Sequence, residues 1–391
     1  MSQFPQVELD EIFEIARGGS PRPIDSFITD DPNGVNWIMI GDAKEGSKYI
    51  TSTKKRIIRD GVKKSRRVSP GDFLLTNSMS FGKPYILKTS GCIHDGWLVL
   101  SPRTDRIDHD YIYHLLGSDL LYNEFEKRAA GAVVKNLNSN LVRSVKIPLP
   151  HKNGKPDLDE QKRIAAILDK ADAIRRKRQQ ALRLTDDFLR SVFLDMFGDP
   201  VTNPMGWDVE ELKNLGKVST GTTPPSKNEG MFDGDIPFVT PGDLMEGPVV
   251  TRRSVTEEGA KNSRVVRAGA TFVCCIGATI GKMGKAAARS SFNQQINAVE
   301  WDDRVTDDYG LEVLKFFKST IATRGSSTTL PILNKSAFQS LEIPVPPREL
   351  QDKFSATLAT LQRFRGRQEE VRSSGADLFA ALQQRAFRGE L

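Results

Sequence analysis

A glycine-containing turn is the stretch of this sequence that most resembles a phosphate-binding loop. It reads Gly277-Ala-Thr-Ile-Gly-Lys-Met283. A nucleotide-binding loop of this kind needs four residues between its glycines and a Ser or Thr after the lysine to hold magnesium. Here three residues separate the glycines, and a methionine follows the lysine. Phe81-Gly-Lys83 stands at the matching place in the first half of the chain, so we predict a turn in a repeated scaffold.

Three other patterns could carry chemistry, and each is incomplete. Asp157 and Glu160 could bind a metal, but both lie at the start of one helical pattern. Acidic residues there stabilise the helix through their interaction with its dipole, which explains them better. Asn203-Pro-Met-Gly206 lacks the second proline and the aromatic residue of an amino-methyltransferase loop. The cysteines and histidines show no metal-ligand spacing. The sequence therefore predicts no catalytic residue, no metal site and no cofactor in this chain.

Basic residues are concentrated at corresponding places in the two halves of the chain. The net charge is +6 at pH 7, with a pI of about 9.1. A basic cluster that occurs twice favours two faces that bind a polyanion, and solvated loops with scattered lysines are the alternative. The candidates for DNA binding are Lys54, Lys55, Arg56, Lys63, Lys64, Arg66, Arg67 and Lys83, together with Lys135, Arg252, Arg253, Lys261, Arg264 and Lys282.

Polar side chains in loops that follow predicted strands could read DNA bases. Lysine and arginine on phosphates supply affinity without sequence information, so sequence must be read by side chains that reach base edges. Turn capping is the alternative role for each of them. The candidates are Asn77, Ser78, Asn136 and Asn138 in the first half, and Gln294, Gln295, Ser326 and Ser327 in the second.

The elements that must position these residues occur twice in the same order. Ser144-Val-Lys-Ile-Pro-Leu-Pro150 corresponds to Ser340-Leu-Glu-Ile-Pro-Val-Pro346, 196 residues later. Pro70-Gly-Asp-Phe-Leu-Leu-Thr76 corresponds to Ala268-Gly-Ala-Thr-Phe-Val-Cys274. A period this long is a duplicated module rather than a solenoid repeat. The residues between the matching segments differ, which is expected if two copies of one scaffold recognise different objects.

The pattern of strands and helices predicts four parts. Short apolar runs that end in turn signals predict α/β modules over residues 1–150 and 205–347. Aspartates at 110 and 308 are predicted to cap one helix in each module. Residues 151–204 and 348–391 carry apolar residues at three- and four-residue steps, which predicts two long amphipathic helices. We expect them to pack as an antiparallel, coiled-coil-like pair with an approximate two-fold axis, through Ile164, Ile167, Leu168, Ile174, Leu182, Phe188, Phe354, Leu358, Leu361, Leu378 and Leu382.

Composition points to a soluble protein of a reducing compartment. Hydrophobic residues make up 38% of the chain, and no apolar run approaches the roughly 20 residues of a membrane span. The amino-terminal residues do not have the pattern of a secretory signal. Three cysteines, two of them adjacent, do not suit a disulfide framework, so we expect a cytoplasmic protein.

The duplicated order of module, Ile-Pro segment and helix resembles the specificity subunit of type I restriction-modification systems. The strongest markers are Lys146-Ile-Pro-Leu-Pro150 and Glu160-Gln-Lys-Arg-Ile-Ala-Ala166, and the resemblance covers essentially the whole chain. It implies two target recognition domains that each read half of a split DNA target. It also implies that the helices dock two modification subunits, which use S-adenosylmethionine, and that motor-nuclease subunits complete the complex. ATP and magnesium would then be needed in the partner subunits.

Two other functions stay open at this point. The chain could be a standalone nuclease or nucleotide hydrolase on a duplicated domain, although neither copy contains a complete catalytic pattern. It could also be an adaptor with two protein-binding modules and no role on DNA. Magnesium-dependent cleavage by the chain alone would favour the first alternative, and a lack of DNA retention would favour the second.

Overall fold

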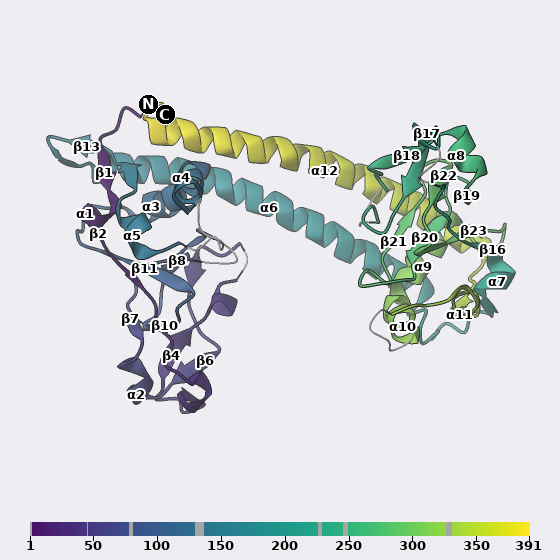
Figure 1. The fold of residues 1–391 in the computed structure, drawn as a ribbon, viewed down its shortest axis with the longest axis horizontal. Helices are drawn as coiled ribbons and strands as arrows, with labels where there is room; N and C mark the ends of the chain where they lie inside the picture. Colours follow the sequence, from purple (N-terminus) through teal and green to yellow (C-terminus); the bar gives the residue numbers. More distant parts are fainter. Residues whose placement is uncertain are drawn as a thin grey trace. The chain divides into compact units, whose positions relative to one another are not determined.

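The computed structural model describes residues 2–391 except 45, 78–80, 130–136, 226–228, 245–248 and 326–330. The chain forms two compact units, Met1–Ala181 with Gln368–Leu391, and Leu182–Arg367. We call them unit 1 and unit 2, and their globular parts module 1 and module 2. Each unit contains its module and a section of both long helices (Figure 1). The four-part division of the sequence stays a prediction, because the units follow contacts rather than chain order.

Module 1 contains two five-stranded sheets that pack on each other. The first has the order β2-β11-β8-β9-β5, and the second β3-β6-β4-β10-β7. Strand β8 is buried on both faces, because Phe73 and Leu75 contact a helical layer whereas Leu74 contacts the second sheet. The bounds are β2 Phe13–Arg17, β11 Trp97–Pro102, β8 Phe73–Thr76, β9 Pro84–Leu87 and β5 Tyr49–Ile50, then β3 Ile28–Thr29, β6 Lys55–Ile57, β4 Val35–Ile38, β10 Gly91–Ile93 and β7 Arg66–Val68.

Module 2 repeats this architecture with two four-stranded sheets. Their orders are β16-β23-β20-β21 and β18-β17-β22-β19. The parallel pair β17–β22 corresponds to the parallel pair β4–β10 of module 1. Strand β20 again divides its side chains, with Val273 toward the helices and Phe272 toward the second sheet. The bounds are β16 Gly216–Thr220, β23 Ile296–Trp301, β20 Thr271–Cys274 and β21 Met283–Lys285, then β18 Arg253–Val255, β17 Phe232–Val239, β22 Ser290–Phe292 and β19 Val265–Val266.

Short elements complete each module in the same order. A two-stranded ribbon ties the start of each module to its Ile-Pro segment, through β1 with β12 and through β15 with β24. The bounds in unit 1 are β1 Gln6–Glu8, α1 Leu9–Ile12, α2 Arg59–Val62, α3 His109–Leu116, α4 Asp119–Ala129, α5 Ser139–Arg143, β12 Lys146–Pro148, β13 His151–Lys152 and β14 Lys155–Pro156. Those in unit 2 are β15 Val209–Glu211, α7 Leu212–Leu215, α8 Glu257–Lys261, α9 Asp307–Phe316, α10 Lys318–Arg324, α11 Lys335–Gln339 and β24 Glu342–Pro344.

The two long helices run antiparallel within each unit. They are α6 (Leu158–Phe197) and α12 (Arg348–Arg388). In unit 1 the start of α6 and the end of α12 enter the core of module 1, through Ile164, Ala165, Leu168, Ala386 and Phe387. In unit 2 the end of α6 and the start of α12 enter the core of module 2, through Phe193, Phe197, Phe354 and Leu358. The long helices are thus buried chiefly by the modules.

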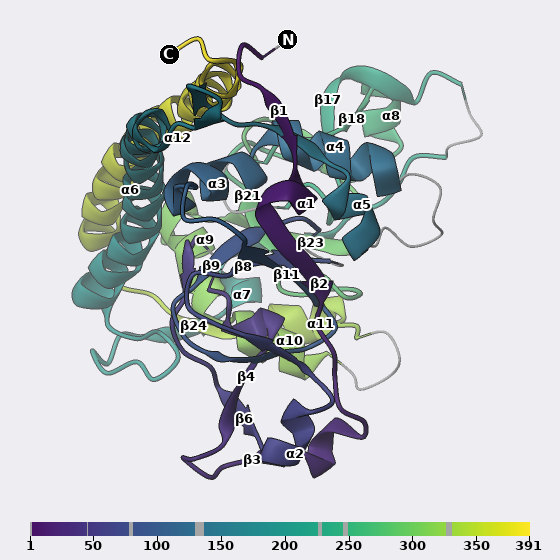
Figure 2. The ribbon, with the colours of Figure 1, turned by 90° about the vertical axis from the view of Figure 1, so that its left-hand side faces the viewer.

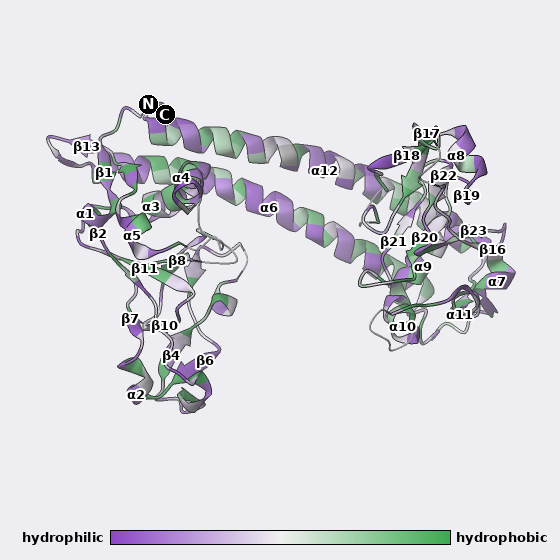
Figure 3. Ribbon diagram, viewed as in Figure 1, coloured by the Kyte–Doolittle hydropathy of each residue, from purple (hydrophilic) through white to green (hydrophobic). Residues whose placement is uncertain are grey.

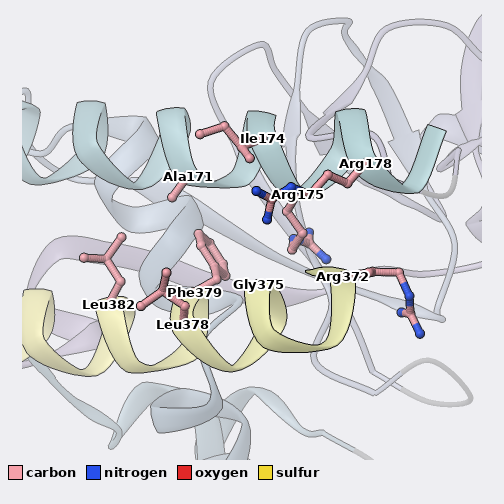
Figure 4. Close-up of a pocket in the computed structure, with 9 residues that line it drawn as sticks. All are labelled: Ala171, Ile174, Arg175, Arg178, Arg372, Gly375, Leu378, Phe379 and Leu382. Carbon is pink, nitrogen blue, oxygen red and sulfur yellow. The ribbon is translucent and has the colours of Figure 1, made fainter. Parts of the chain in front are cut away.

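Three residues predicted to pair the helices are not buried. Ile174, Phe188 and Leu378 are 52%, 54% and 71% exposed, and Figure 3 shows hydrophobic and hydrophilic residues interspersed along both helices. Ile167, Leu182, Leu361 and Leu382 are half-buried. In unit 1 the helices border a groove instead of closing on each other (Figure 4). It is lined by Ala171, Ile174, Arg175 and Arg178 of α6 and by Arg372, Gly375, Leu378, Phe379 and Leu382 of α12. The arginines of the lining keep their charged ends in water, which holds the two helices apart. The small side chains at Ala171 and Gly375 do not fill the space between the helices, so the groove remains.

A buried glutamine joins α6 to α3 in unit 1. Gln161 is fully buried, and its Oε1 accepts a hydrogen bond from the backbone N–H of Asp108 at 2.9 Å. Its Nε2 donates to the carbonyl of Arg106 at 3.2 Å. Asp108 is the N-cap of α3, since its carboxylate accepts from the N–H groups of Asp110 and Tyr111. The predicted cap at Asp110 was therefore wrong by two residues.

Unit 2 contains the same junction. Gln351 is fully buried, and its Oε1 accepts from the N–H of Thr306 at 2.9 Å. Its Nε2 donates to the carbonyls of Arg304 at 2.9 Å and Pro346 at 2.8 Å. Thr306, and not the predicted Asp308, is the N-cap of α9. The duplication thus preserves a polar junction between each long helix and the first turn of a module helix.

A tyrosine forms a second duplicated contact. The hydroxyl of Tyr111 donates to the carbonyl of Pro148 at 2.8 Å, and that of Tyr309 donates to the carbonyl of Pro344 at 2.8 Å. Burial raises the pKa of both phenols far above the ordinary value, so each remains a donor. The Ile-Pro segment of module 1 is therefore held against α3, and that of module 2 against α9.

A second polar network joins module 1 to α6. Lys48 Nζ lies 2.6 Å from Asp110 Oδ1 and 3.0 Å from Asp169 Oδ1. The same Asp169 oxygen lies 2.7 Å from His114 Nε2. Asp172, one turn further along α6, pairs with Arg175 and Arg176 of its own helix. The side chain of His114 is only 3% exposed, so its protonation state matters to folding.

We expect unit 1 to lose stability in mild acid. Burial lowers the pKa of His114 below its ordinary value of 6.5, although the facing Asp169 acts to raise it. The unfolded chain binds this proton near pH 6.5, whereas the folded chain resists it, so the stabilisation is present above about pH 6.5 and lost as pH falls through the folded pKa. The melting temperature should therefore fall between about pH 7.5 and about pH 5.5. His114→Asn should reduce this fall, and an equal fall in the variant would contradict the assignment.

Candidate nucleic-acid interface

The basic residues of module 1 surround its second sheet. Lys54, Lys55, Arg56, Arg66 and Arg67 are all exposed. In Figures 1 and 2, β4, β6 and α2 lie at the end of module 1 opposite α6 and α12. Among the described contacts none of these five side chains has a carboxylate partner. Their charge is therefore available to an external anion.

Strand register places these cations on both faces of the sheet. Lys55 is opposite Trp37, and Arg67 is opposite Cys92, and both neighbours belong to the same buried cluster. Directly opposed residues share a face. Arg56 and Arg66 alternate with Lys55 and Arg67 along their strands, so they project to the other side. The cluster is therefore divided between β6 and β7 and between the two faces of the sheet, and it does not form one flat basic face.

Two further basic candidates of module 1, Lys63 and Lys64, are exposed and contact neighbouring side chains. Lys63 pairs with Asp60 across one helical turn at 3.7 Å, and Lys64 Nζ lies 4.9 Å from the ring centre of Phe27. Lys83 is exposed in a turn whose backbone accepts a hydrogen bond from the Thr76 N–H. Such surface contacts are weak, so these lysines can still meet phosphate. Lys135 lies outside the described residues.

Among the predicted cations that the structure describes, module 2 has fewer without a side-chain contact than module 1. Arg252, Arg264 and Lys282 are exposed. Arg253 stacks 4.3 Å from the ring centre of Phe232 on β17, and Lys261 lies 3.5 Å from Glu258. Fewer free cations should give module 2 the smaller share of the electrostatic affinity.

One basic position is the same in both modules. Ser65-Arg66 and Ser263-Arg264 precede the buried ends of β7 and β19. Ser65 Oγ donates to the carbonyl of Ile93, and Ser263 Oγ lies 2.7 Å from Ser291 Oγ, so both serines fasten the strand to its neighbour. Arg66 and Arg264 are thereby held at equivalent places beside the turn that follows β10 and β22.

Two of the predicted base-reading residues make hydrogen bonds within the scaffold. Asn77 is 1% exposed, and its Nδ2 donates to the carbonyl of Asp95 at 2.6 Å. Asn138 is exposed, but its Oδ1 accepts from the Leu141 N–H at 2.9 Å as the N-cap of α5. Capping, the alternative role, therefore describes Asn138 in the folded chain. Ser78, Asn136, Ser326 and Ser327 lie outside the described residues.

The turn between β22 and β23 contains the two glutamines that the sequence singled out. Gln295 Oε1 accepts from Asn293 Nδ2 at 3.1 Å, which keeps Gln295 within the turn. Gln294 is exposed, and its Oε1 accepts from the hydroxyl of Thr223 at 2.7 Å. Gln294 therefore presents the end of its side chain to solvent, whereas Gln295 is half-buried.

Sequence reasoning missed Asp95, which occupies the place of Gln294 in module 1. It lies in the turn between β10 and β11, and its Oδ1 accepts from the hydroxyl of Ser20 at 2.7 Å. This hydrogen bond holds the pKa of Asp95 below its usual range, so the carboxylate stays ionised. Aligning His94-Asp-Gly96 with Asn293-Gln-Gln295 would have found the equivalence.

The patterns that resembled catalytic sites are parts of the scaffold. Gly277–Lys282 forms a turn between β20 and β21, with no helix after it to hold phosphate. Asp157 Oδ1 accepts from the N–H groups of Asp159 and Glu160, which starts α6. Asn203 makes paired hydrogen bonds with the backbone of Trp207.

The cysteines and acidic groups give no metal site in the described part of the chain. Cys92, Cys274 and Cys275 are buried as free thiols, and burial raises the pKa of Cys275 to about 12. Groups of three or more potential metal ligands are absent from the described residues. No helix there combines the length and apolar character that crossing a bilayer requires.

The duplicated loops and basic positions can be set beside known proteins. Residues 1–184 and 204–372 each match the model of the type I restriction modification DNA specificity domain. The specificity subunit of the type I restriction enzyme MjaIX from Methanocaldococcus jannaschii is 23% identical, over 90% of this chain and 85% of that protein.

Two solved structures share the fold. One, solved in work on complex assembly and conformational transition of the type I R-M system, has a TM-score of 0.61 at 19% identity and covers all of both chains. The other, an S subunit from M. genitalium, has a TM-score of 0.57 at 14% identity and covers 99% of this chain and 96% of that one. They confirm the predicted fold class of two α/β modules with long helices. With two copies of its domain in one polypeptide, the chain belongs to the type I restriction-modification DNA specificity family.

Proposed function

We propose that this chain is the non-catalytic specificity subunit of a type I restriction-modification complex. Module 1 and module 2 each read one half of a double-stranded DNA target, with an unread spacer between the halves. The observation that carries this is the duplicated scaffold, in which equivalent loops present different side chains, Asp95 in one copy and Gln294 in the other. Different readers select different bases, so the target is asymmetric.

The long helices would dock two modification subunits. Beyond the module cores they present large apolar side chains to solvent, an arrangement that favours a protein partner over permanent exposure. These side chains are Ile174, Leu184, Phe188, Phe364, Val371 and Leu378. The partners would bring S-adenosylmethionine for methylation, and motor-nuclease subunits would bring ATP and magnesium chemistry. The complex would act on DNA in the cytoplasm.

Selection from a random DNA library tests this proposal. The chain with its modification subunits is expected to retain fragments that share two short, different half-sites at a fixed separation. A single undivided or palindromic motif would contradict the two-module reading. Magnesium-dependent cleavage by the chain alone would show an enzyme instead, and failure to retain any DNA sequence would favour the protein-binding adaptor.

The basic cluster of module 1 should contribute to the salt dependence of DNA binding. Arg66→Gln with Arg67→Gln removes two exposed cations that project to opposite faces of the sheet. The magnitude of the slope of log K against log salt should therefore fall by about 0.9 for each of the two that contacts phosphate, and by about 2 if both do. Lys152→Gln with Lys155→Gln removes equal charge from the β13–β14 hairpin and serves as the control. Fluorescence anisotropy at several salt concentrations measures both. Equal slopes for the two variants would exclude Arg66 and Arg67 from the phosphate contacts.

A further inference from the structure

The turn that carries Asp95 (residues 94–96) packs against the loop of residues 18–20. In module 2 the turn of residues 293–295 packs in the same way against the loop of residues 221–223. We call these two loops the glycine loops. The Gly18 N–H donates to the carbonyl of Trp97 at 2.9 Å, and the Gly221 N–H donates to the carbonyl of Ile296 at 3.0 Å. A Cβ at Gly18 would collide with the carbonyl oxygen of His94, the first residue of the turn. A Cβ at Gly221 would meet the same turn of module 2. Only glycine permits this approach, so the backbones of turn and loop are in direct contact in each module.

The other side chains of the turn are occupied by the scaffold. In module 1 the ring of His94 lies against the backbone, with Nδ1 2.8 Å from the Gly96 nitrogen and Nε2 3.2 Å from the Ile40 nitrogen, and the neutral ring accepts a hydrogen bond at one of these two nitrogens. In module 2 Asn293 Oδ1 accepts from the Gln295 N–H, and its Nδ2 donates to the Gln295 side chain. The central residues of the turns, Asp95 and Gln294, bond instead to hydroxyl groups of the glycine loops.

One oxygen of each central side chain is anchored, and the other polar atom is open. Asp95 Oδ1 and Gln294 Oε1 each accept from a hydroxyl of the glycine loop, Ser20 and Thr223, at 2.7 Å. Among the described residues, the contact of Asp95 Oδ2 is a weak one, to the mostly exposed Arg22, whose Nη2 lies 3.7 Å away. Gln294 Nε2 has no hydrogen-bond partner among the described residues. A side chain oriented by one hydrogen bond and free at the other atom is preorganised to read a ligand.

Both turns are flanked by the equivalent arginines. Arg66 is opposite Ile93, the residue just before the turn of module 1. In module 2 the Arg264 N–H donates to Thr222 Oγ1 at 2.7 Å, beside the hydroxyl that anchors Gln294. A cation next to a hydrogen-bonding side chain suits DNA, because the cation meets phosphate while its neighbour reaches a base edge. A carboxylate such as Asp95 is repelled by phosphate, so it fits only where a base offers a donor.

Resting on the proposed function, we infer that Asp95 and Gln294 are equivalent base-reading residues of the two modules. Asp95 accepts a hydrogen bond from a base amino group, that of cytosine N4, in the half-site of module 1. Gln294 donates through Nε2 and accepts through Oε1 on the N7 and N6 edge of adenine, in the half-site of module 2. Ser20 and Thr223 are positioning residues, since each acts by orienting its reader.

Methylation motifs of isosteric variants test this inference. Asp95→Asn and Gln294→Glu preserve side-chain shape, so the full chain can be expressed with its modification subunits and the motif read from host DNA. Asp95→Asn should reduce discrimination at one base pair of one half-site by roughly 5- to 150-fold. Gln294→Glu should do the same at one base pair of the other half-site. The untouched half-site and the spacer should not change.

Two controls separate a reading role from a structural one. Asp105→Asn and Gln3→Glu make the same chemical changes at exposed positions outside the turns and the long helices, and their motifs should match that of the unmodified chain. Equal melting temperatures would show that the reader variants fold. An unchanged motif in both reader variants, or weakening of both half-sites together, would overturn the inference and leave the proposed function standing. Absence of any bipartite motif with the unmodified chain would overturn both.

Discussion

Phe354→Ala is expected to lower the free energy of unfolding of unit 2 by about 3–5 kcal/mol, the usual cost of emptying a buried phenylalanine site. Phe354 is fully buried at the start of α12. Its ring meets those of Phe193 and Phe197 of α6 edge-on, at centroid distances of 5.5 Å and 5.4 Å. Both α6 rings also pack on Tyr309 of α9. The substitution therefore loosens the joint where two long helices and a module helix meet.

A matched substitution on the same helix serves as the control for Phe354→Ala. Phe364 is 46% exposed, so Phe364→Ala should change stability by no more than about 0.5 kcal/mol. Urea denaturation followed by circular dichroism measures both variants. Comparable losses from Phe354→Ala and Phe364→Ala would mean that the aromatic cluster does not hold unit 2 together.

Removal of either buried glutamine should cost nearly as much. Gln351→Ala leaves the N–H of Thr306 and the carbonyls of Arg304 and Pro346 without the partner that satisfies them. Each unsatisfied buried group costs about 1–3 kcal/mol, so we expect a loss of about 3 kcal/mol or more. Gln161→Ala leaves two such groups in unit 1, so its effect should be smaller, about 2 kcal/mol or more.

The order of the two glutamine effects is the sharper test. Gln351→Ala should destabilise its unit more than Gln161→Ala destabilises the other, because it frees one more carbonyl. Gln362→Ala and Gln180→Ala, at exposed positions of the same two helices, should be close to neutral. Differential scanning calorimetry compares all four variants. Neutral values for both buried positions would show that water replaces the side chain at these junctions.

The duplicated scaffold could be predicted from the sequence because its strands and helices depend on local patterns of residues. The glycine at 71 and the apolar run after it predicted the strand at Phe73–Thr76, and the corresponding pattern predicted Thr271–Cys274. Three- and four-residue periodicity predicted α6 and α12, since it persists over many turns. Such signals depend on neighbours in the chain and need no knowledge of the tertiary fold.

Features that depend on tertiary contacts could not be predicted in this way. Asp108 and Asp110 are equally good caps in sequence, and the distant Gln161 carbonyl oxygen marks the real one by taking the Asp108 N–H. Periodicity shows that Ile174 and Leu378 lie on apolar stripes but not what covers them, and here neither is buried. Asp95 is an ordinary turn residue until the loop of Ser20 is folded against it.

Under the proposed function, this one chain sets a split, asymmetric DNA target. Sequencing modified adenines in the host genome, with the gene intact and deleted, measures that most directly. Deletion is expected to abolish methylation at one motif of two different half-sites around a fixed spacer, and restoring the gene should restore that methylation. A methylation pattern that keeps every motif after deletion, in a host whose modification subunit is active, would contradict the proposed function.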